Sequence, residues 1–215
     1  MPIVVDRKGA GDARPGDLAV VSGRRGRARV QRVLGSAKRI ENVLEALLVE
    51  TGARQGFELH GAPAPSLEGR VDLRDELSFT IDPETAKDFD DALTLKDGRA
   101  YVHIADVSHF VPAGTPLDRG AAERAFSTYV PGRVAPMLPP DLSEDLCSLR
   151  PHEDRLCVTV EIPLDGGEPS FYRSVIRSRA RFSYGRAEEI LAGRAERPLA
   201  GGRRRDRGGG ERARH

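Results

Sequence analysis

Four aspartates stand within ten residues near the middle of this 215-residue chain. Counted from the first, they occupy relative positions 0, +6, +8 and +9, and they are Asp82, Asp88, Asp90 and Asp91. Carboxylates this close repel one another unless a cation neutralises them. Because this stretch contains no His or Cys, the ligands would all be oxygens, which favours Mg²⁺, Mn²⁺ or Ca²⁺ over Zn²⁺.

The positions of the acids argue for magnesium among these cations. A calcium-binding EF-hand loop starting at Asp88 would need Gly at its position 6 and Glu at position 12, but the chain has Leu93 and Arg99 there. Magnesium uses a few carboxylates with water and substrate phosphates, which suits phosphodiester cleavage. The alternative is an acidic surface loop. Pro83 and the apolar segment before Asp82 favour the metal site.

Alternating apolar residues predict the strands that would position this cluster. One strand ends at Asp82, and a hairpin follows with strands over 92–95 and 100–105, because the sequence 96–99, Lys-Asp-Gly-Arg, is a turn signal. A second hairpin is predicted with strands over 155–164 and 170–182. Two helices are predicted, one over 117–127 and one over 186–191.

The N-terminal part differs in character. Short β-branched segments alternate with Gly, Pro and Arg, and they predict strands over 3–5, 18–21 and 28–34. Apolar residues at helical spacing predict an amphipathic helix over 39–51. A linker is expected over 61–66, and the Gly- and Arg-rich residues after Gly193 are expected to be disordered.

The net charge of +1 conceals a partition. Residues 1–38 hold nine basic and three acidic side chains, residues 193–215 hold eight and three, and residues 39–192 hold 17 and 27. Basic ends therefore flank an acidic middle. No apolar run approaches the ~20 residues of a membrane span. Two cysteines cannot form a disulfide scaffold, which favours a reducing compartment and a cytoplasmic location.

Five blocks in order make the chain resemble the RNB-domain exoribonucleases, the ribonuclease II and ribonuclease R group. The aspartate stretch is the first block, and the other four follow it in the order that the family has. The blocks span 80–92, 102–111, 127–140, 142–149 and 178–184. The opening residues are similar to the end of the cold-shock-type OB domain that precedes the RNB domain in this family.

The resemblance implies an α+β fold with four parts. These are a partial OB-like β unit over 1–38, a linking helix and linker over 39–69, the N-terminal half of an RNB catalytic domain over 70–192, and the tail over 193–215. The family removes nucleotides one at a time from the 3′ end of single-stranded RNA, as nucleoside 5′-monophosphates, with Mg²⁺ in the site. No protein partner is predicted.

The resemblance also assigns residues. Asp82, Asp88, Asp90 and Asp91 would hold Mg²⁺ and position the attacking water, with Asp90 the most important for chemistry. Tyr129 and Tyr184 would stack on RNA bases. A family RNB domain is longer and its distal half supplies an arginine and a glutamate, so we expect a fragment or a frame-shifted product of a larger ribonuclease.

Other residues allow two interpretations. Arg177, Arg179 and Arg181 alternate along the strand predicted over 170–182 and share a face, so they form either a phosphate-contacting stripe for RNA or an exposed strand face. The histidines and cysteines are expected in the core or behind the site; they are His103, His109, Cys147 and Cys157. Two other functions stay open: a non-catalytic RNA-binding remnant and a phosphohydrolase acting on a small phosphoester.

Overall fold

The structure, a computed structural model, describes residues 4–5, 7–23, 28–52, 56–57 and 61–195. It contains two compact units, each built from two separate segments. Unit 1 comprises Met1–Pro65 and Asp106–Cys147, and unit 2 comprises Ser66–Ala105 and Ser148–His215. The aspartate cluster belongs to unit 2.

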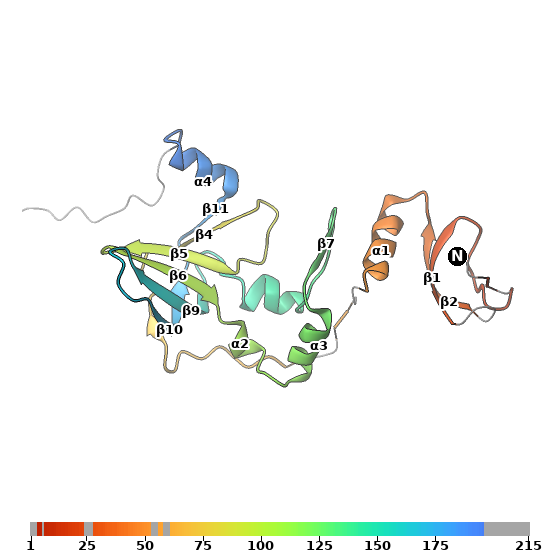
Figure 1. The fold of residues 1–215 in the computed structure, drawn as a ribbon, viewed down its shortest axis with the longest axis horizontal. Helices are drawn as coiled ribbons and strands as arrows, with labels where there is room; N and C mark the ends of the chain where they lie inside the picture. The colour runs from red at the N-terminus through yellow and green to blue at the C-terminus, as the bar shows by residue number, and fades with distance from the viewer. Residues whose placement is uncertain (1–3, 6, 24–27, 53–55, 58–60, 196–215) are drawn as a thin grey trace, which may run out of the picture. The chain divides into compact units, whose positions relative to one another are not determined.

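Unit 2 is built on a seven-stranded sheet (Figure 1). The strand order is β11-β4-β5-β6-β9-β10-β3, and all neighbours are antiparallel except β11–β4 and β10–β3. The strands are β3 Val71–Asp72, β4 Phe79–Asp82, β5 Asp91–Lys96, β6 Arg99–Ala105, β9 Asp154–Pro163, β10 Ser170–Arg177 and β11 Ala180–Ser183. Helix α4 (Tyr184–Leu191) follows β11 directly.

Strands β10 and β11 are close in sequence but stand near opposite ends of the strand order. The sheet must therefore curl on itself to bring them together. Only Ser178 and Arg179 join them, a link that spans roughly 11 Å at most. The backbone N–H of Arg179 donates to the carbonyl of Ser78 over 2.7 Å, and that of His152 donates to Ser178 over 2.7 Å. The single strand predicted over 170–182 is therefore wrong, because β10 ends at Arg177 and β11, which pairs with β4, begins at Ala180.

The inner face of this sheet buries a chain of polar side chains across four strands. The hydroxyl of Thr94 donates to the carbonyl of Leu77 over 3.3 Å, so it accepts from Nε2–H of His103 at 3.1 Å. Nδ1 of His103 then accepts from Thr159 at 2.8 Å, and Thr159 accepts from Ser174 at 2.6 Å. Burial lowers the pKa of His103 to about 4. His103 is thus a neutral core residue.

The hairpin predicted around 96–99 is confirmed. Strands β5 and β6 pair from Asp91↔Ile104 to Lys96↔Arg99. Both turn residues have positive φ, 48° at Asp97 and 73° at Gly98, as the tight turns that match strand twist require. The short helix predicted over 186–191 is confirmed as α4, and it begins two residues earlier because the Ser183 side chain accepts from the Arg186 N–H.

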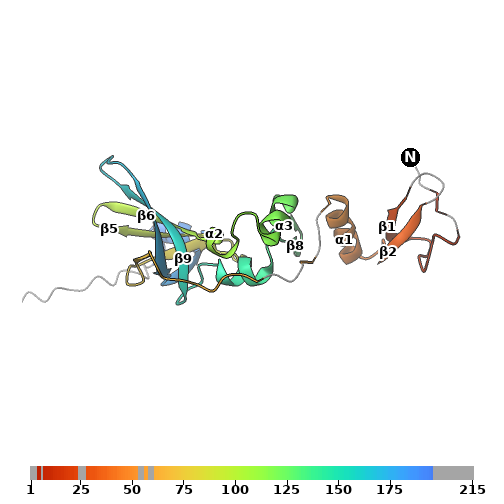
Figure 2. The same ribbon diagram turned by 90° about the horizontal axis from the view of Figure 1, so that it is seen from below.

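Unit 1 contains short elements (Figure 2). Its elements are β1 Asp17–Ser22, β2 Arg29–Ser36, α1 Ile40–Glu50, α2 Val107–Phe110, α3 Pro116–Arg124, β7 Thr128–Val130, β8 Arg133–Ala135 and the π-helix η1 Leu142–Leu146. The predicted strands over 18–21 and 28–34 and the helix over 39–51 are confirmed. The helix predicted over 117–127 ends at Arg124, because Ala125 takes φ 66°.

Parts of the predictions fall beyond the described ranges. In the strand predicted over 3–5, Val5 forms an isolated bridge with Ala28, and residue 3 lies outside the described residues. The tail predicted to be disordered lies outside them from residue 196 onward. Within the described residues, no helix has both the length and the apolar character needed to cross a bilayer.

Candidate active site

The four aspartates lie where strand β4 ends and strand β5 begins, at one end of these strands in the unit 2 sheet. This end is called the aspartate edge. Asp82 is the last residue of β4 and Asp91 is the first of β5. Because β4 and β5 are antiparallel neighbours, the last residue of β4 and the first residue of β5 lie at the same end of the strand pair. Asp88 and Asp90 lie in the loop between them, where the N–H of Ala105 donates to the carbonyl of Asp90 over 2.9 Å.

Asp82 is the buried member of the set, with 9% of its surface exposed. Its loss of contact with water raises its pKa above the ordinary value. The nearby Thr80 hydroxyl and the Arg181 guanidinium oppose this rise, whereas the carboxylates of Asp91 and Asp88 add to it. Asp82 is therefore an enclosed carboxylate with like charges beside it.

Asp90 shows the same electrostatic pattern although part of it reaches the surface. Partial removal from water raises its pKa, and the carboxylates of Asp88, Asp91 and Asp82 raise it further. Asp82 and Asp90 each respond to the other acids, so the four carboxylates share one negative environment. A divalent cation placed there would offset part of that negative charge.

The donor set fits a hard divalent cation in its chemistry. Oδ2 of Asp82 is buried and has no hydrogen-bond partner among the described residues, as expected for an oxygen whose partner is an ion. All the ligands would be carboxylate oxygens, which Mg²⁺ prefers. Across the described ranges, however, no three His, Cys, Asp or Glu side chains lie close enough together to hold an ion as they stand.

The two tyrosines predicted to stack on bases belong to different units. Tyr184 opens α4 with 61% of its surface exposed, and the preceding residue, Ser183, is the register partner of Asp82. Tyr184 therefore begins its helix at the aspartate edge of the sheet. Tyr129 lies on β7 of unit 1, where it pairs with Val134 and is 64% exposed.

The three arginines do not form a stripe along one strand. Arg177 ends β10, and its Nε donates to Asp154 over 2.7 Å, a contact that raises the pKa of Arg177. Arg179 lies between the strands and donates to the carbonyl of Arg74 over 2.9 Å. Arg181 lies on β11. Each guanidinium thus has an internal partner.

Ser148 contacts the aspartate loop in a way that its position in the sequence does not predict. This residue was part of a family block, without any assigned function, yet its fully buried hydroxyl contacts the backbone of the aspartate loop. The available signal was a small polar residue inside the apolar segment 146–149. The partner residues are about 60 positions away in sequence, so spacing alone could not identify them.

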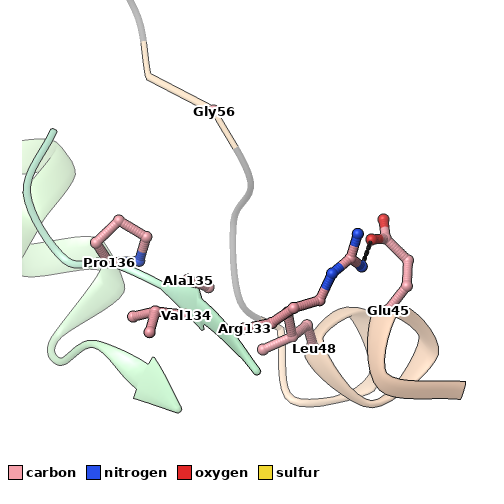
Figure 3. A pocket seen from close by; sticks show the side chains of 7 residues that line it. All are labelled: Glu45, Leu48, Gly56, Arg133, Val134, Ala135 and Pro136. Carbon is pink, nitrogen blue, oxygen red and sulfur yellow. Dashed lines mark hydrogen bonds and ion pairs between the residues drawn. The ribbon is translucent and has the colours of Figure 1, made fainter. Parts of the chain in front are cut away.

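Unit 1 has a separate hollow of ≈ 250 Å³ (Figure 3). Figure 3 shows the Arg133 guanidinium turned toward the Glu45 carboxylate, and the two form an ion pair. Glu45 also pairs with Arg32 over 2.9 Å. The hollow is lined by Glu45, Leu48, Gly56, Arg133, Val134, Ala135 and Pro136. Its basic residue is therefore neutralised within the unit.

Comparison with known proteins gives a family match over the region that contains the site. The family described as RNB domain matches residues 70–201. Ribonuclease R of Aquifex aeolicus is 49% identical over 134 residues, which cover 58% of this chain and 19% of that protein. The chain spans about a fifth of the length of the curated relatives it matches.

Two solved structures share the fold. Mycoplasma genitalium RNase R, in complex with double-stranded RNA, has a TM-score of 0.78 at 28% identity, covering 91% of this chain and 40% of that one. Yeast Ssd1, described as a pseudonuclease, has a TM-score of 0.66 at 19% identity, covering 82% and 26%, so its likeness concerns the fold alone. These matches confirm a mixed α+β fold containing part of an RNB domain.

Proposed function

The chain belongs to the RNB-domain family, and from this we propose that it acts in the Mg²⁺-dependent 3′→5′ hydrolysis of single-stranded RNA to nucleoside 5′-monophosphates. The observation that carries the proposal is the set of four mutually repelling carboxylates at the shared edge of β4 and β5. The set lies inside the family match. Relatives that carry the name ribonuclease R support the same reaction.

Each aspartate has a place in the proposed site. Asp82, Asp88, Asp90 and Asp91 would hold the cation, which when bound supplies activation of water and stabilisation of the leaving oxygen. The buried Asp82 anchors the set at the end of β4. Asp90 reaches the surface, and its proposed role is to accept a hydrogen bond from the attacking water and orient it.

RNA binding would involve residues of both units. The exposed ring of Tyr184 stacks on a base near the aspartate edge, a contact worth ~1–3 kcal/mol, and Tyr129 is proposed as a second stacking residue. The basic residues of 1–38 form the proposed OB-like RNA-binding unit. Phosphate contacts by Arg177 and Arg179 stay predictions. The two cysteines are buried and are not joined in a disulfide, which supports the proposal of a cytoplasmic setting.

A second function is favoured by one observation. In the described part of the chain, no three acidic side chains lie close enough together to bind a metal ion without rearrangement. This arrangement suits a protein that binds RNA without cleaving it. Such a non-catalytic remnant would keep Tyr184 and the basic arm but would not shorten RNA.

The test is a single-stranded RNA labelled at its 5′ end, incubated with the chain in Mg²⁺ or in EDTA. We expect stepwise shortening in Mg²⁺ that EDTA and Asp90→Asn abolish. The matched control is Asp97→Asn, which removes an acid at the β5–β6 turn, where positive φ suits Asn. RNA binding without shortening in any variant would favour the non-catalytic function instead.

A further inference from the structure

The loop that carries the aspartates depends on contacts from outside itself. Residues 83–90 contain no helix or strand, and within them the N–H of Ala86 donates to the carbonyl of Pro83 over 3.0 Å. A connecting loop of this kind is mobile unless other elements fix it. Two side chains from later parts of unit 2 contact this loop.

Ser148 fixes the backbone on both sides of Asp88. Its hydroxyl donates to the carbonyl of Lys87 over 2.7 Å and accepts from the N–H of Phe89 over 3.1 Å. The next residue, Leu149, donates its N–H to the carbonyl of Phe89 over 2.9 Å. Three hydrogen bonds of ordinary length therefore fix the backbone immediately before and after one proposed ligand.

Arg181 holds the loop from another direction. Its Nη2 donates to the carbonyl of Pro83 over 2.6 Å and to that of Glu84 over 2.9 Å. The same guanidinium lies over the Phe89 ring, 5.0 Å from its centroid, within cation–π distance. One planar group thus joins the start of the loop, just after Asp82, to the residue that precedes Asp90.

We propose that Ser148 and Arg181 are positioning residues, a loop brace that holds Asp82, Asp88 and Asp90 toward a common divalent cation. This inference rests on the proposed function. It gives Arg181 a different role from the RNA phosphate contact that the sequence suggested. The brace acts on the backbone, so it changes where the carboxylates stand without touching RNA or the reacting atoms.

The test measures Mn²⁺ binding to the full chain by electron paramagnetic resonance, with Mn²⁺ as the probe. Ser148→Ala removes the hydroxyl, and Arg181→Lys keeps the charge but loses the planar fork. We expect both to weaken Mn²⁺ binding by about 10–100-fold, the usual effect of losing a group that orients a ligand. Arg181→Lys keeps the inference testable if Ser148→Ala does not fold.

Two controls separate positioning from general stability. Ser178→Ala removes another buried hydroxyl, which donates to the carbonyl of Ala180 over 3.1 Å, and Arg99→Lys alters an arginine that pairs with Glu161. Both should bind Mn²⁺ like the wild type. Equal weakening in the controls, or unchanged binding in both brace variants, would overturn the inference.

Amide hydrogen exchange in EDTA distinguishes the brace from the cation site. Ser148→Ala should speed exchange at the Phe89 N–H, which loses its acceptor, with Ser178→Ala unchanged there. Wild-type protein that binds no Mn²⁺ would contradict the proposed function, and with it the role of the brace toward a cation. Intact Mn²⁺ binding with unchanged exchange in Ser148→Ala would contradict the brace alone.

Discussion

Asp82 destabilises the cation-free protein when it is charged. Its native pKa is raised, so the folded state favours the protonated form. Stability linked to this group is fully present below the ordinary value of 3.8 and is lost as pH rises through the raised native pKa. At pH 7 the buried carboxylate therefore opposes folding.

We predict that Asp82→Asn raises the melting temperature of the chain at pH 7 in EDTA, because it removes a buried charge and keeps the shape. The gain should shrink toward pH 3.8. Mg²⁺ should stabilise the wild type but leave the variant unaffected. Thermal denaturation followed by circular dichroism measures this, and a variant that melts below the wild type in EDTA would refute the reasoning.

His103 gives a pH dependence of opposite sign. Its native pKa of about 4 lies below the ordinary 6.5, so the unfolded chain binds the proton more tightly. Stability is full above pH 6.5 and is lost as pH falls toward 4. The shift corresponds to about 3 kcal/mol of unfolding free energy.

Urea denaturation between pH 4 and pH 7 checks this prediction. We expect His103→Gln, which can still hydrogen-bond but does not titrate, to lack this part of the pH dependence. A curve of the same slope in His103→Gln would show that acid sensitivity arises elsewhere.

The aspartates could be found from sequence because their types and spacing are local. The residues that contact the aspartate loop could not be found in this way. Ser148 meets Lys87 and Phe89 only through the fold, and the partners of Arg177 and Arg181 depend on how strands are arranged. Alternation correctly placed polar and apolar residues on strands, but it did not show that Arg177 ends one strand and Arg181 belongs to the next.

Among the elements, the hairpins and amphipathic helices were predictable because each is specified by its own residues. The strand over 170–182 was not, since the break at Ser178 depends on bonds to distant backbone groups. Short elements such as β7, β8 and η1 also escaped prediction. They lack a period long enough to detect.

Two glycines, one in the β5–β6 turn and one in helix α4, give a test of the backbone conformation. Gly98 has φ 73° and Gly185 lies in α4 without positive φ, and a Cβ at either would meet nothing within 4 Å. Gly98→Ala should cost about 1–2 kcal/mol through backbone strain, and Gly185→Ala should gain about 0.5–1 kcal/mol. Urea denaturation measures both, and effects of equal sign would contradict the assigned backbone conformations.

Considered as a whole, unit 2 exposes an apolar outer sheet face. Leu93, Val102, Val160 and Phe171 form one cross-strand row through successive register pairs. Leu95 lies two residues beyond Leu93 on the same face and is 71% exposed, and Phe171 is 68% exposed. Contiguous apolar surface of this kind promotes association.

We therefore predict that the chain self-associates at micromolar concentration and that Leu95→Gln with Phe171→Gln reduces this association. Sedimentation velocity over a concentration series measures it. The matched control is Lys96→Gln with Arg173→Gln, which changes exposed polar residues of the same strands. A wild-type chain that stays monomeric throughout would contradict the prediction.

We propose that the aspartate edge of unit 2 hydrolyses RNA from its 3′ end with Mg²⁺. The most direct measurement uses single-stranded RNA whose 3′-terminal nucleotide carries a radiolabelled 5′-phosphate, with products separated by thin-layer chromatography. The wild-type chain with Mg²⁺ should release labelled nucleoside 5′-monophosphate as the first product, and Asp90→Asn should release none. Equal release by both chains, or none by the wild type with RNA bound, would contradict the claim.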